Sequence, residues 1–88
     1  MATNGNNYKE TVSAVTTAWS SLIAYNKNRT ALTIYNPNAV DAYMGISEAG
    51  KVRIPPYRGM SFTADTVPLN ALGGNLSSGS GDLIVWEA

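Results

Sequence analysis

Short apolar runs separated by turn-forming residues recur along the whole sequence, and their length and spacing predict strands rather than helices. In residues 30–36, Leu32 and Ile34 alternate with Thr33 and Tyr35, so one face of the expected strand is apolar. The other runs are similarly short and rich in β-branched or aromatic residues, which favour extended backbone. The runs that we expect to be strands are residues 11–19, 21–26, 30–36, 42–47, 52–54, 59–64, 67–72 and 82–88.

Asparagine, glycine, proline and serine mark the connections between these runs. The turns are expected at residues 26–29, 37–41, 48–51 and 55–56, and the Gly/Ser-rich residues 73–81 are expected to form a flexible loop. Seven or eight short strands at this spacing predict an all-β fold, a single compact antiparallel β-sandwich of the jelly-roll or immunoglobulin-like kind. The pattern leaves open which strands pair. We expect residues 1–10, which are polar and rich in asparagine, to form a flexible arm, and residues 11–88 to form the sandwich domain.

Composition narrows the function classes. The 88 residues contain no cysteine and no histidine, and six basic residues balance six acidic ones. Without thiols the core has no disulfide, so packing or partner subunits must stabilise it. A net charge of zero argues against non-specific nucleic-acid binding, which needs a basic field, and only 14% charged residues suit assembly. No apolar run is long enough to span a membrane and the start lacks a signal-peptide pattern, so we expect synthesis in the cytoplasm.

The sequence contains no convincing catalytic or metal-binding constellation. The sequence has neither histidine nor cysteine. It therefore lacks the usual general base, the thiol nucleophile and the usual ligands of transition metals. The carboxylates are scattered and mostly lie beside turns, and residues 73–81 lack the lysine and the following helix of a phosphate-binding loop. We therefore predict a protein that is not an enzyme and that uses no cofactor or metal.

The aromatic residues are a stronger signal, because two tryptophans, five tyrosines and one phenylalanine exceed what a core of this size needs. Tyrosine is common at protein interfaces, because its ring can be buried against a partner while its hydroxyl group bonds to water or a polar group. The tyrosines are equally compatible with ordinary sheet-surface positions. Tyr57 is the best single interface candidate, because Pro55 and Pro56 stiffen the segment that presents it beside Arg58.

Arg29 precedes one strong strand and Glu87 ends another, so antiparallel pairing of these strands would bring the two charges together. An opposite-charge pair across a ladder contributes about 0.2–1 kcal/mol to stability. The pair would therefore serve more to fix the register of the two strands, or as a subunit contact, than to stabilise the fold. If the pair forms in this way, exchanging the two charges should restore what either single substitution loses.

The order of these motifs resembles small β-sandwich structural proteins of tailed bacteriophages over about residues 26–87. In that family an arginine precedes a Leu-x-Ile/Val-x-Asn strand, a Tyr-x-Gly strand and a Pro-Gly turn follow, and the last strand often ends in Val-x-Glu. The longer turn at residues 55–59 departs from the family pattern. The matching positions are Arg29, Leu32, Ile34, Asn36, Tyr43, Gly45, Pro56, Gly59, Val85 and Glu87.

The resemblance implies a non-enzymatic role on the virion. Similar proteins are capsid decoration (cement) proteins, head-fibre bases and small tail proteins, frequently trimeric, and a decoration protein stabilises the capsid from outside. The expected partners are therefore two further copies of the chain and the major capsid protein or another virion protein, with no nucleic acid and no membrane. Candidate subunit or capsid contacts are Tyr8, Lys9, Trp19, Arg29, Pro55, Pro56, Tyr57, Arg58 and Glu87.

Two alternatives stay open at this point. The chain is either a decoration protein or a head-fibre or tail component, which copy number per particle distinguishes. A different class is a glycan-binding β-sandwich module, in which Trp19 and Tyr57 would stack against sugar rings.

Overall fold

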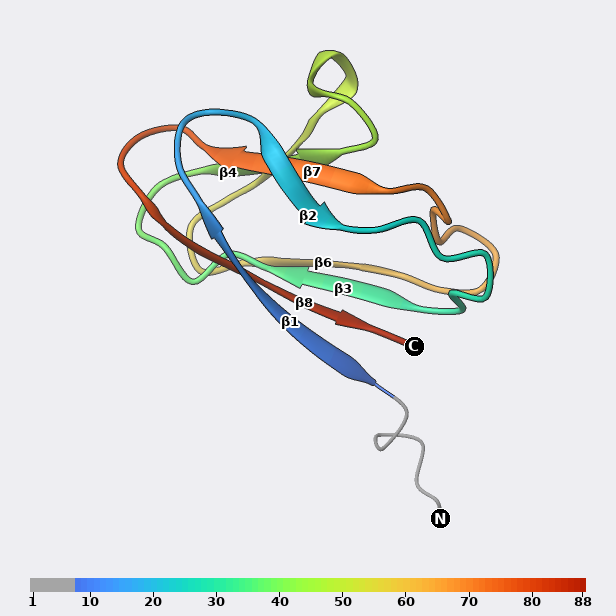
Figure 1. The fold of residues 1–88 in the computed structure, drawn as a ribbon. Coiled ribbons are helices and arrows are strands. Elements are labelled where there is room, and N and C mark those ends of the chain that lie inside the picture. Colours follow the sequence, from blue (N-terminus) through green and yellow to red (C-terminus); the bar gives the residue numbers. More distant parts are fainter. Residues whose placement is uncertain (1–7) are drawn as a thin grey trace.

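The computed structural model describes residues 8–88. It has eight strands, a single turn of 3-10 helix labelled η2, and no α-helix in the described part (Figure 1). The elements are β1 (Lys9–Val15), β2 (Ser20–Ile23), β3 (Leu32–Tyr35), β4 (Ala42–Gly45), η2 (Glu48–Gly50), β5 (Val52–Ile54), β6 (Gly59–Phe62), β7 (Leu72–Leu76) and β8 (Gly81–Glu87).

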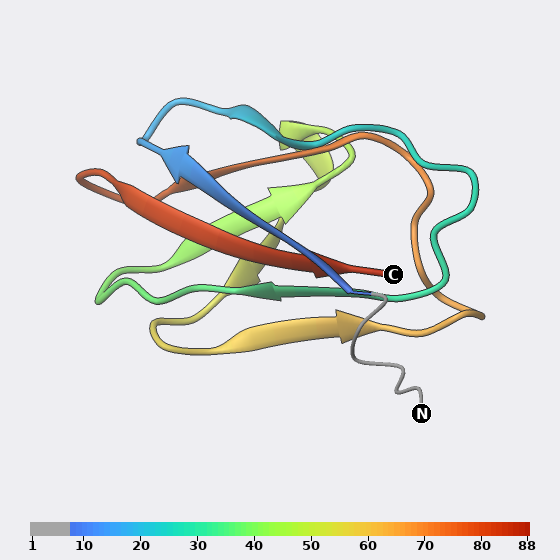
Figure 2. The same ribbon diagram turned by 60° about the horizontal axis from the view of Figure 1, so that its bottom comes forward.

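The strands form two four-stranded antiparallel sheets that lie face to face as two layers (Figures 1 and 2). Sheet A has the order β1-β8-β3-β6, and sheet B has the order β2-β7-β4-β5. The first strand pairs with the last, the second with the seventh, the third with the sixth and the fourth with the fifth. The chain thus follows the path of one long hairpin rolled into a sandwich, which is the jelly-roll order. The predicted all-β sandwich is confirmed, and the strand order decides for the jelly roll over the immunoglobulin-like alternative.

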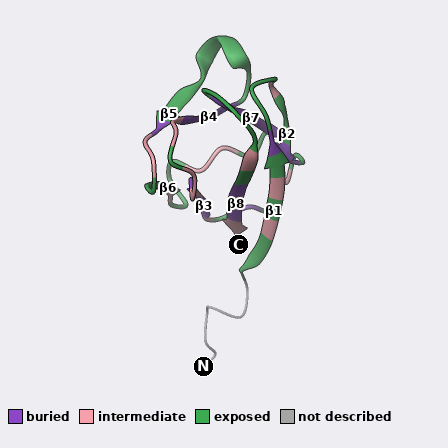
Figure 3. Cartoon of the chain, turned by 90° about the vertical axis from the view of Figure 1, so that its left-hand side faces the viewer, coloured by how far each residue is buried: buried purple, intermediate pink, exposed green. Residues whose placement is uncertain are grey.

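The core lies between the two sheets (Figure 3), and in β3 and β8 buried residues alternate with more exposed ones. Leu32 and Ile34 of β3 are fully buried, as their alternation with polar residues predicted. On the neighbouring strand β8, Val85 lies beside Ile34 and Leu83 is also buried. The buried apolar residues are Val15, Leu22, Ile23, Leu32, Ile34, Ala42, Met44, Ile54, Leu72, Leu76, Leu83 and Val85.

Asn36, in the Asn-Pro-Asn stretch after β3, is a structural residue, completely buried. Its side-chain amide donates to the carbonyl oxygens of Val40 and Ile54, at 2.8 and 3.0 Å. Its carbonyl oxygen accepts from the backbone N–H and the side chain of Asn38. Because both ends of the side chain are satisfied, a buried amide stabilises this turn instead of weakening the core.

The sequence prediction is wrong at residues 67–76, whereas residues 77–80 form a connection between strands, as expected. Leu72–Leu76 form the strand β7, although Gly73, Gly74 and Asn75 were expected in a loop, and residues 67–71 precede the strand. The glycines are needed because neighbouring groups occupy the space of a side chain. A Cβ atom on Gly73 would lie 2.5 Å from the Trp19 indole nitrogen, and one on Gly74 would lie 2.6 Å from the Tyr43 carbonyl oxygen.

The start of the sandwich also differs from the expected boundary. β1 begins at Lys9, so Lys9 and Glu10 belong to sheet A rather than to the expected arm. β1 pairs with β8 along its entire length, from Lys9 opposite Glu87 to Val15 opposite Gly81. Residues 1–7, the rest of the expected arm, lie outside the described residues.

Candidate functional site

Arg29 joins three segments of the chain at one end of the sandwich, and its side chain is fully buried. Its Nε donates to the Glu87 Oε2 at 2.7 Å. Its Nη2 donates to the carbonyl oxygen of Ala24 at 2.7 Å, just after β2. Its Nη1 donates to the carbonyl oxygens of Pro68 and Asn70, before β7. Charge-assisted bonds of this kind are shorter and stronger than neutral ones.

The predicted pairing of Arg29 with Glu87 is confirmed, but its setting differs from the prediction. Leu32 is the residue opposite Glu87 in the β3–β8 ladder, so Arg29 reaches the carboxylate from the connection before β3. The side chain of Arg29 has no exposed surface and that of Glu87 is 14% exposed. Arg29 is therefore a residue that stabilises the fold, and its burial removes it as a contact residue for a partner.

The carboxylate of Glu87 is held ionised by its neighbours. Burial raises its pKa, but hydrogen bonds from Arg29 and Asn26 and the positive charges of Arg29 and Lys9 outweigh this effect. The pKa of Glu87 therefore lies below its ordinary value. The result is a rigid, negatively charged group at the end of β8.

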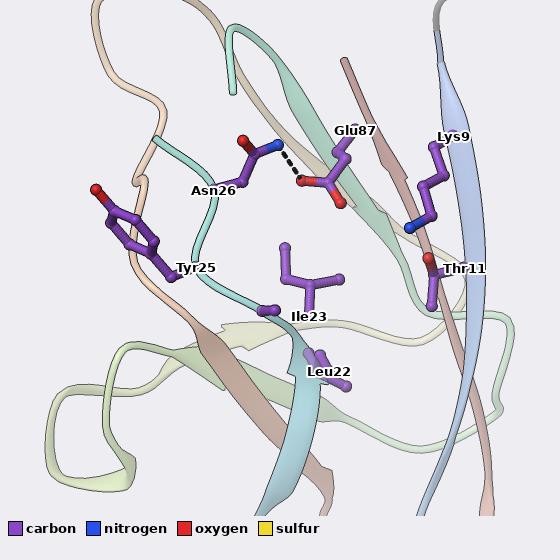
Figure 4. A pocket seen from close by; sticks show the side chains of 8 residues that line it. Lys9, Thr11, Leu22, Ile23, Tyr25, Asn26 and Glu87 are labelled. Atoms are coloured by element: carbon purple, nitrogen blue, oxygen red, sulfur yellow. Dashed lines mark hydrogen bonds between the residues drawn. The ribbon is translucent and has the colours of Figure 1, made fainter. Parts of the chain in front are cut away.

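A cleft of about 360 Å³ opens beside this carboxylate, between the edge strands β1 and β2 of the two sheets (Figure 4). Ile23 and Leu22 form its apolar floor. Lys9 and Thr11 of β1 line one side and Asn26 lines the other, while Glu87 of β8 lies between Asn26 and Lys9. The residues lining the cleft are Lys9, Thr11, Leu22, Ile23, Ala24, Tyr25, Asn26 and Glu87.

The outer face of sheet A carries an apolar platform, which is a second candidate contact surface. Ile84 of β8 lies between Val12 of β1 and Tyr35 of β3 in the registers of the sheet, and Trp86 lies two residues along β8. These side chains face outward, because the alternating residues of β8 are buried. Tyr8 joins them beside Trp86, in a shallow hollow that Thr33 completes. The platform consists of Tyr8, Val12, Tyr35, Ile84 and Trp86.

The platform is partly ordered by hydrogen bonds along its rim. The indole N–H of Trp86 donates to the Glu10 carboxylate at 2.9 Å. The hydroxyl groups of Thr33 and Ser61 bond to each other at 2.9 Å on the same face. Val12 is 54% exposed and Tyr8 is 46% exposed. An exposed apolar surface with a polar rim is typical of protein interfaces.

The outer face of sheet B is instead covered by its own side chains. Trp19 lies over Gly73 and is only partly exposed. Lys51 places its ammonium group 4.6 Å from the centre of the Tyr43 ring, a cation–π contact. Asn75 donates to the carbonyl oxygen of Thr17 and is almost completely buried. The two outer faces therefore differ: that of sheet A presents several apolar side chains, whereas Trp19 and Tyr43 on sheet B are in contact with Gly73 and Lys51.

Tyr57 lies at the tip of the turn between β5 and β6, where Arg58 N donates to the carbonyl oxygen of Pro55. It is 61% exposed and has a left-handed backbone, with φ of 56°. This region is costly for a residue with a Cβ atom, and glycine or asparagine is the usual choice. Arg58 is exposed beside it, while Pro55 and Pro56 are partly buried.

The predicted contact residues are distributed over several places. Lys9, Arg29 and Glu87 meet at one end of the sandwich, where Lys9 and Glu87 line the cleft. Tyr8 lies at the platform, Trp19 lies on sheet B, and the four residues 55–58 form the β5–β6 turn. The residues that sequence reasoning missed are Val12, Tyr35, Ile84 and Trp86 of the platform. The uninterrupted apolar run 83–86 was the available signal, because it makes both faces of an antiparallel strand apolar.

Within residues 8–88, no three acidic, histidine or cysteine side chains gather in a group that would hold a metal ion. No helix in this part of the chain has the length and hydrophobicity to cross a membrane. Comparisons with protein-family models, with curated proteins and with solved structures find no match for the chain.

Proposed function

We propose that this protein is a non-enzymatic structural component of a bacteriophage virion, a decoration protein that binds the capsid exterior as a homotrimer and stabilises it. The apolar platform of sheet A carries the proposal. Its side chains come from three adjacent strands, so they form one continuous surface on a rigid sheet. Such a surface loses little conformational entropy when a partner covers it.

The size of the chain supports an assembled state. A standard interface buries about 800 Å² per partner, and the described residues expose 4963 Å² in total. One such contact would cover about a sixth of that surface, which is a large gain for a domain with a small core. The balanced charge of the chain also leaves little electrostatic repulsion between copies.

The fold supports the class of protein by analogy. Jelly rolls serve as viral capsid domains, as lectin domains and as cupins. The motif resemblance to phage structural proteins favours the first of these uses. Analogy of fold never shows function by itself, so the platform remains the observation to test.

Tyr57 supplies a second contact for the capsid. The left-handed backbone of Tyr57 destabilises the fold by about 1–3 kcal/mol. Because Tyr57 is 61% exposed, packing of its ring within the chain offsets little of this destabilisation. A side chain kept at this cost is best explained by a contact that it makes elsewhere. Arg58 beside it adds a charged group that can pair with a carboxylate of the partner.

Binding to particles tests the proposal. Virions that lack the protein are mixed with labelled wild-type chain, Val12→Lys or Val52→Lys, and the bound fraction is measured by sedimentation. Val12 lies on the platform at 54% exposure, and Val52 is a strand valine away from it at 43% exposure, so the second variant is a matched control. We expect Val12→Lys to weaken binding at least tenfold and Val52→Lys to bind like wild type.

Wild-type chain that fails to sediment with the particles would refute the decoration role, and equal binding of both variants would refute the role of the platform. Copy number separates the head-fibre or tail alternative. A decoration protein is present at a ratio comparable to the major capsid protein, whereas a fibre or tail component is confined to a few copies. Light scattering should give about three times the mass of the 9.3 kDa chain for the bound form released from particles.

A further inference from the structure

We propose that the cleft between β1 and β2 binds a sugar residue of a glycan through two neighbouring hydroxyl groups. This inference goes beyond the proposed function and does not depend on it, because it concerns a different surface. The platform lies on the outer face of sheet A, whereas the cleft opens at the edge between the two sheets.

The cleft combines an apolar floor with polar groups on opposite sides (Figure 4). Ile23 points up from the floor into its centre, below the carboxylate of Glu87 (Figure 4). Lys9 and Thr11 extend from β1 on the far side. Its volume of about 360 Å³ falls at the lower end of small-molecule sites. This size fits one or two sugar rings.

The carboxylate of Glu87 is ordered before any ligand arrives. Its Oε2 accepts from Arg29 at 2.7 Å and from Asn26 at 3.4 Å. Among the described residues, no hydrogen bond involves its Oε1, which leaves an acceptor for a ligand. The fully buried guanidinium of Arg29 is held by three backbone carbonyl oxygens as well, so the carboxylate has a fixed support. A ligand that binds this oxygen therefore loses little free energy in ordering the protein.

The arrangement of charges favours a neutral polyhydroxyl ligand. A hydroxyl group both donates and accepts, so one hydroxyl of a diol donates to Glu87 Oε1 while its neighbour accepts from Lys9 Nζ. Lys9 lies directly opposite Glu87 in the β1–β8 ladder, and its charge acts on that carboxylate. A cation would be repelled by the charge of Lys9, and an anion would be repelled by that of Glu87. The C–H face of a sugar ring packs on Ile23, as the apolar floor requires.

The test uses the full chain labelled with ¹⁵N and the methyl glycosides of glucose, galactose, mannose and N-acetylglucosamine as probes. Amide chemical shifts are followed during titration at millimolar concentrations. We expect at least one probe to shift amides of residues 9–11, 22–26 and 86–87, with a Kd on the order of 1–10 mM, since a single ring makes few contacts.

Two pairs of variants locate the site. Lys9→Met and Thr11→Val remove the ammonium and the hydroxyl group from the β1 side, and each should weaken binding about tenfold. Lys27→Met and Thr30→Val change an exposed lysine and an exposed threonine outside the cleft, and these controls should bind like wild type. Lys9 is exposed, so Lys9→Met leaves the core intact and tests the site even if Thr11→Val perturbs the sheet.

Three outcomes would overturn the inference. The first is the absence of shifts with all four glycosides. The second is binding that survives Lys9→Met and Thr11→Val unchanged, or that shifts amides near Trp19 or Tyr57 instead. The third is stronger binding of sodium acetate at the same amides, which would identify an anion site. None of these results bears on particle binding through the platform, so the two proposals fail separately.

Discussion

Replacement of Arg29 by methionine tests how strongly this residue stabilises the end of the sandwich at which it joins three segments. Methionine keeps most of the apolar stem of arginine and removes the guanidinium group. The variant loses the ion pair with Glu87 and the hydrogen bonds to three backbone carbonyl oxygens. Glu87, at 14% exposure, is left as a largely buried charge without its main partner.

The expected loss is large relative to the stability of the domain. Breaking a buried ion pair by removing one partner costs about 3–5 kcal/mol. Glu87 keeps some contact with water and lies near Lys9, which favours the lower end, about 3 kcal/mol. At roughly 0.05–0.15 kcal/mol per residue, a domain of this length has a total of about 4–13 kcal/mol. Arg29→Met therefore removes between about a fifth and about three quarters of the stability.

Urea unfolding followed by tryptophan fluorescence measures this loss, and a double-mutant cycle with Glu87→Gln assigns it. In the Arg29→Met background, Glu87→Gln should be neutral or stabilising, because it removes a charge that has lost its partner. We expect a coupling energy of about 1–3 kcal/mol between the two sites. A loss below about 1 kcal/mol for Arg29→Met would refute the reasoning, since that is the range of exposed pairs.

The structure also changes what an exchange of charges should do. Sequence reasoning expects Arg29→Glu combined with Glu87→Arg to restore stability. A glutamate at position 29 would face the carbonyl oxygens of Ala24, Pro68 and Asn70, which need donors. We therefore expect no rescue by the exchange, although the ion pair itself is present.

Three further predictions follow from local geometry and charge. Tyr57→Gly should raise the free energy of unfolding by about 1 kcal/mol, because glycine accepts the φ of 56°; a lower urea midpoint would contradict this. Gly74→Ala should lower the free energy of unfolding by about 2 kcal/mol or more, because a Cβ atom would lie 2.6 Å from the Tyr43 carbonyl oxygen and 2.9 Å from Leu22 Cδ1. A thermal midpoint equal to that of the wild type would show that the strand has room for a methyl group. Since the pKa of Glu87 is lower in the folded state, its contribution is present above the unfolded value near pH 4.5 and is lost as the pH falls through the folded value. Urea midpoints between pH 7 and pH 3 should therefore fall less for Glu87→Gln than for wild type, and parallel curves would contradict the assignment.

Much of the fold could be predicted because side-chain alternation carries the information directly. Leu32 and Ile34 are buried as expected, since a strand with one apolar face has only one stable orientation. The strand β7 could not be predicted from its own residues. Its glycines are typical of a loop by composition, but the segment pairs with β2 and β4, and only glycine fits because Trp19 and the Tyr43 carbonyl oxygen occupy the adjoining space.

The candidate site also has features that the sequence predicts and features that depend on the whole fold. The pairing of Arg29 with Glu87 follows from their positions at the ends of two strands, and the structure confirms it. The burial of Arg29 depends on carbonyl groups from residues 24, 68 and 70, which no local pattern indicates. Likewise, the exposure of Tyr57 agrees with its proline-rich segment, but its left-handed backbone is a property of the whole turn.

The pairing of β1 with β8 has a consequence for how the protein is made. The platform uses Val12 from the first strand and Ile84 from the last, so a chain still on the ribosome has no platform until β8 is synthesised. Contacts between residues so far apart in sequence also form slowly, because the intervening loop must close first. Prematurely terminated chains that lack β8 would therefore have no platform. Under the proposed function, only chains synthesised to the end of β8 would present the surface that binds the capsid.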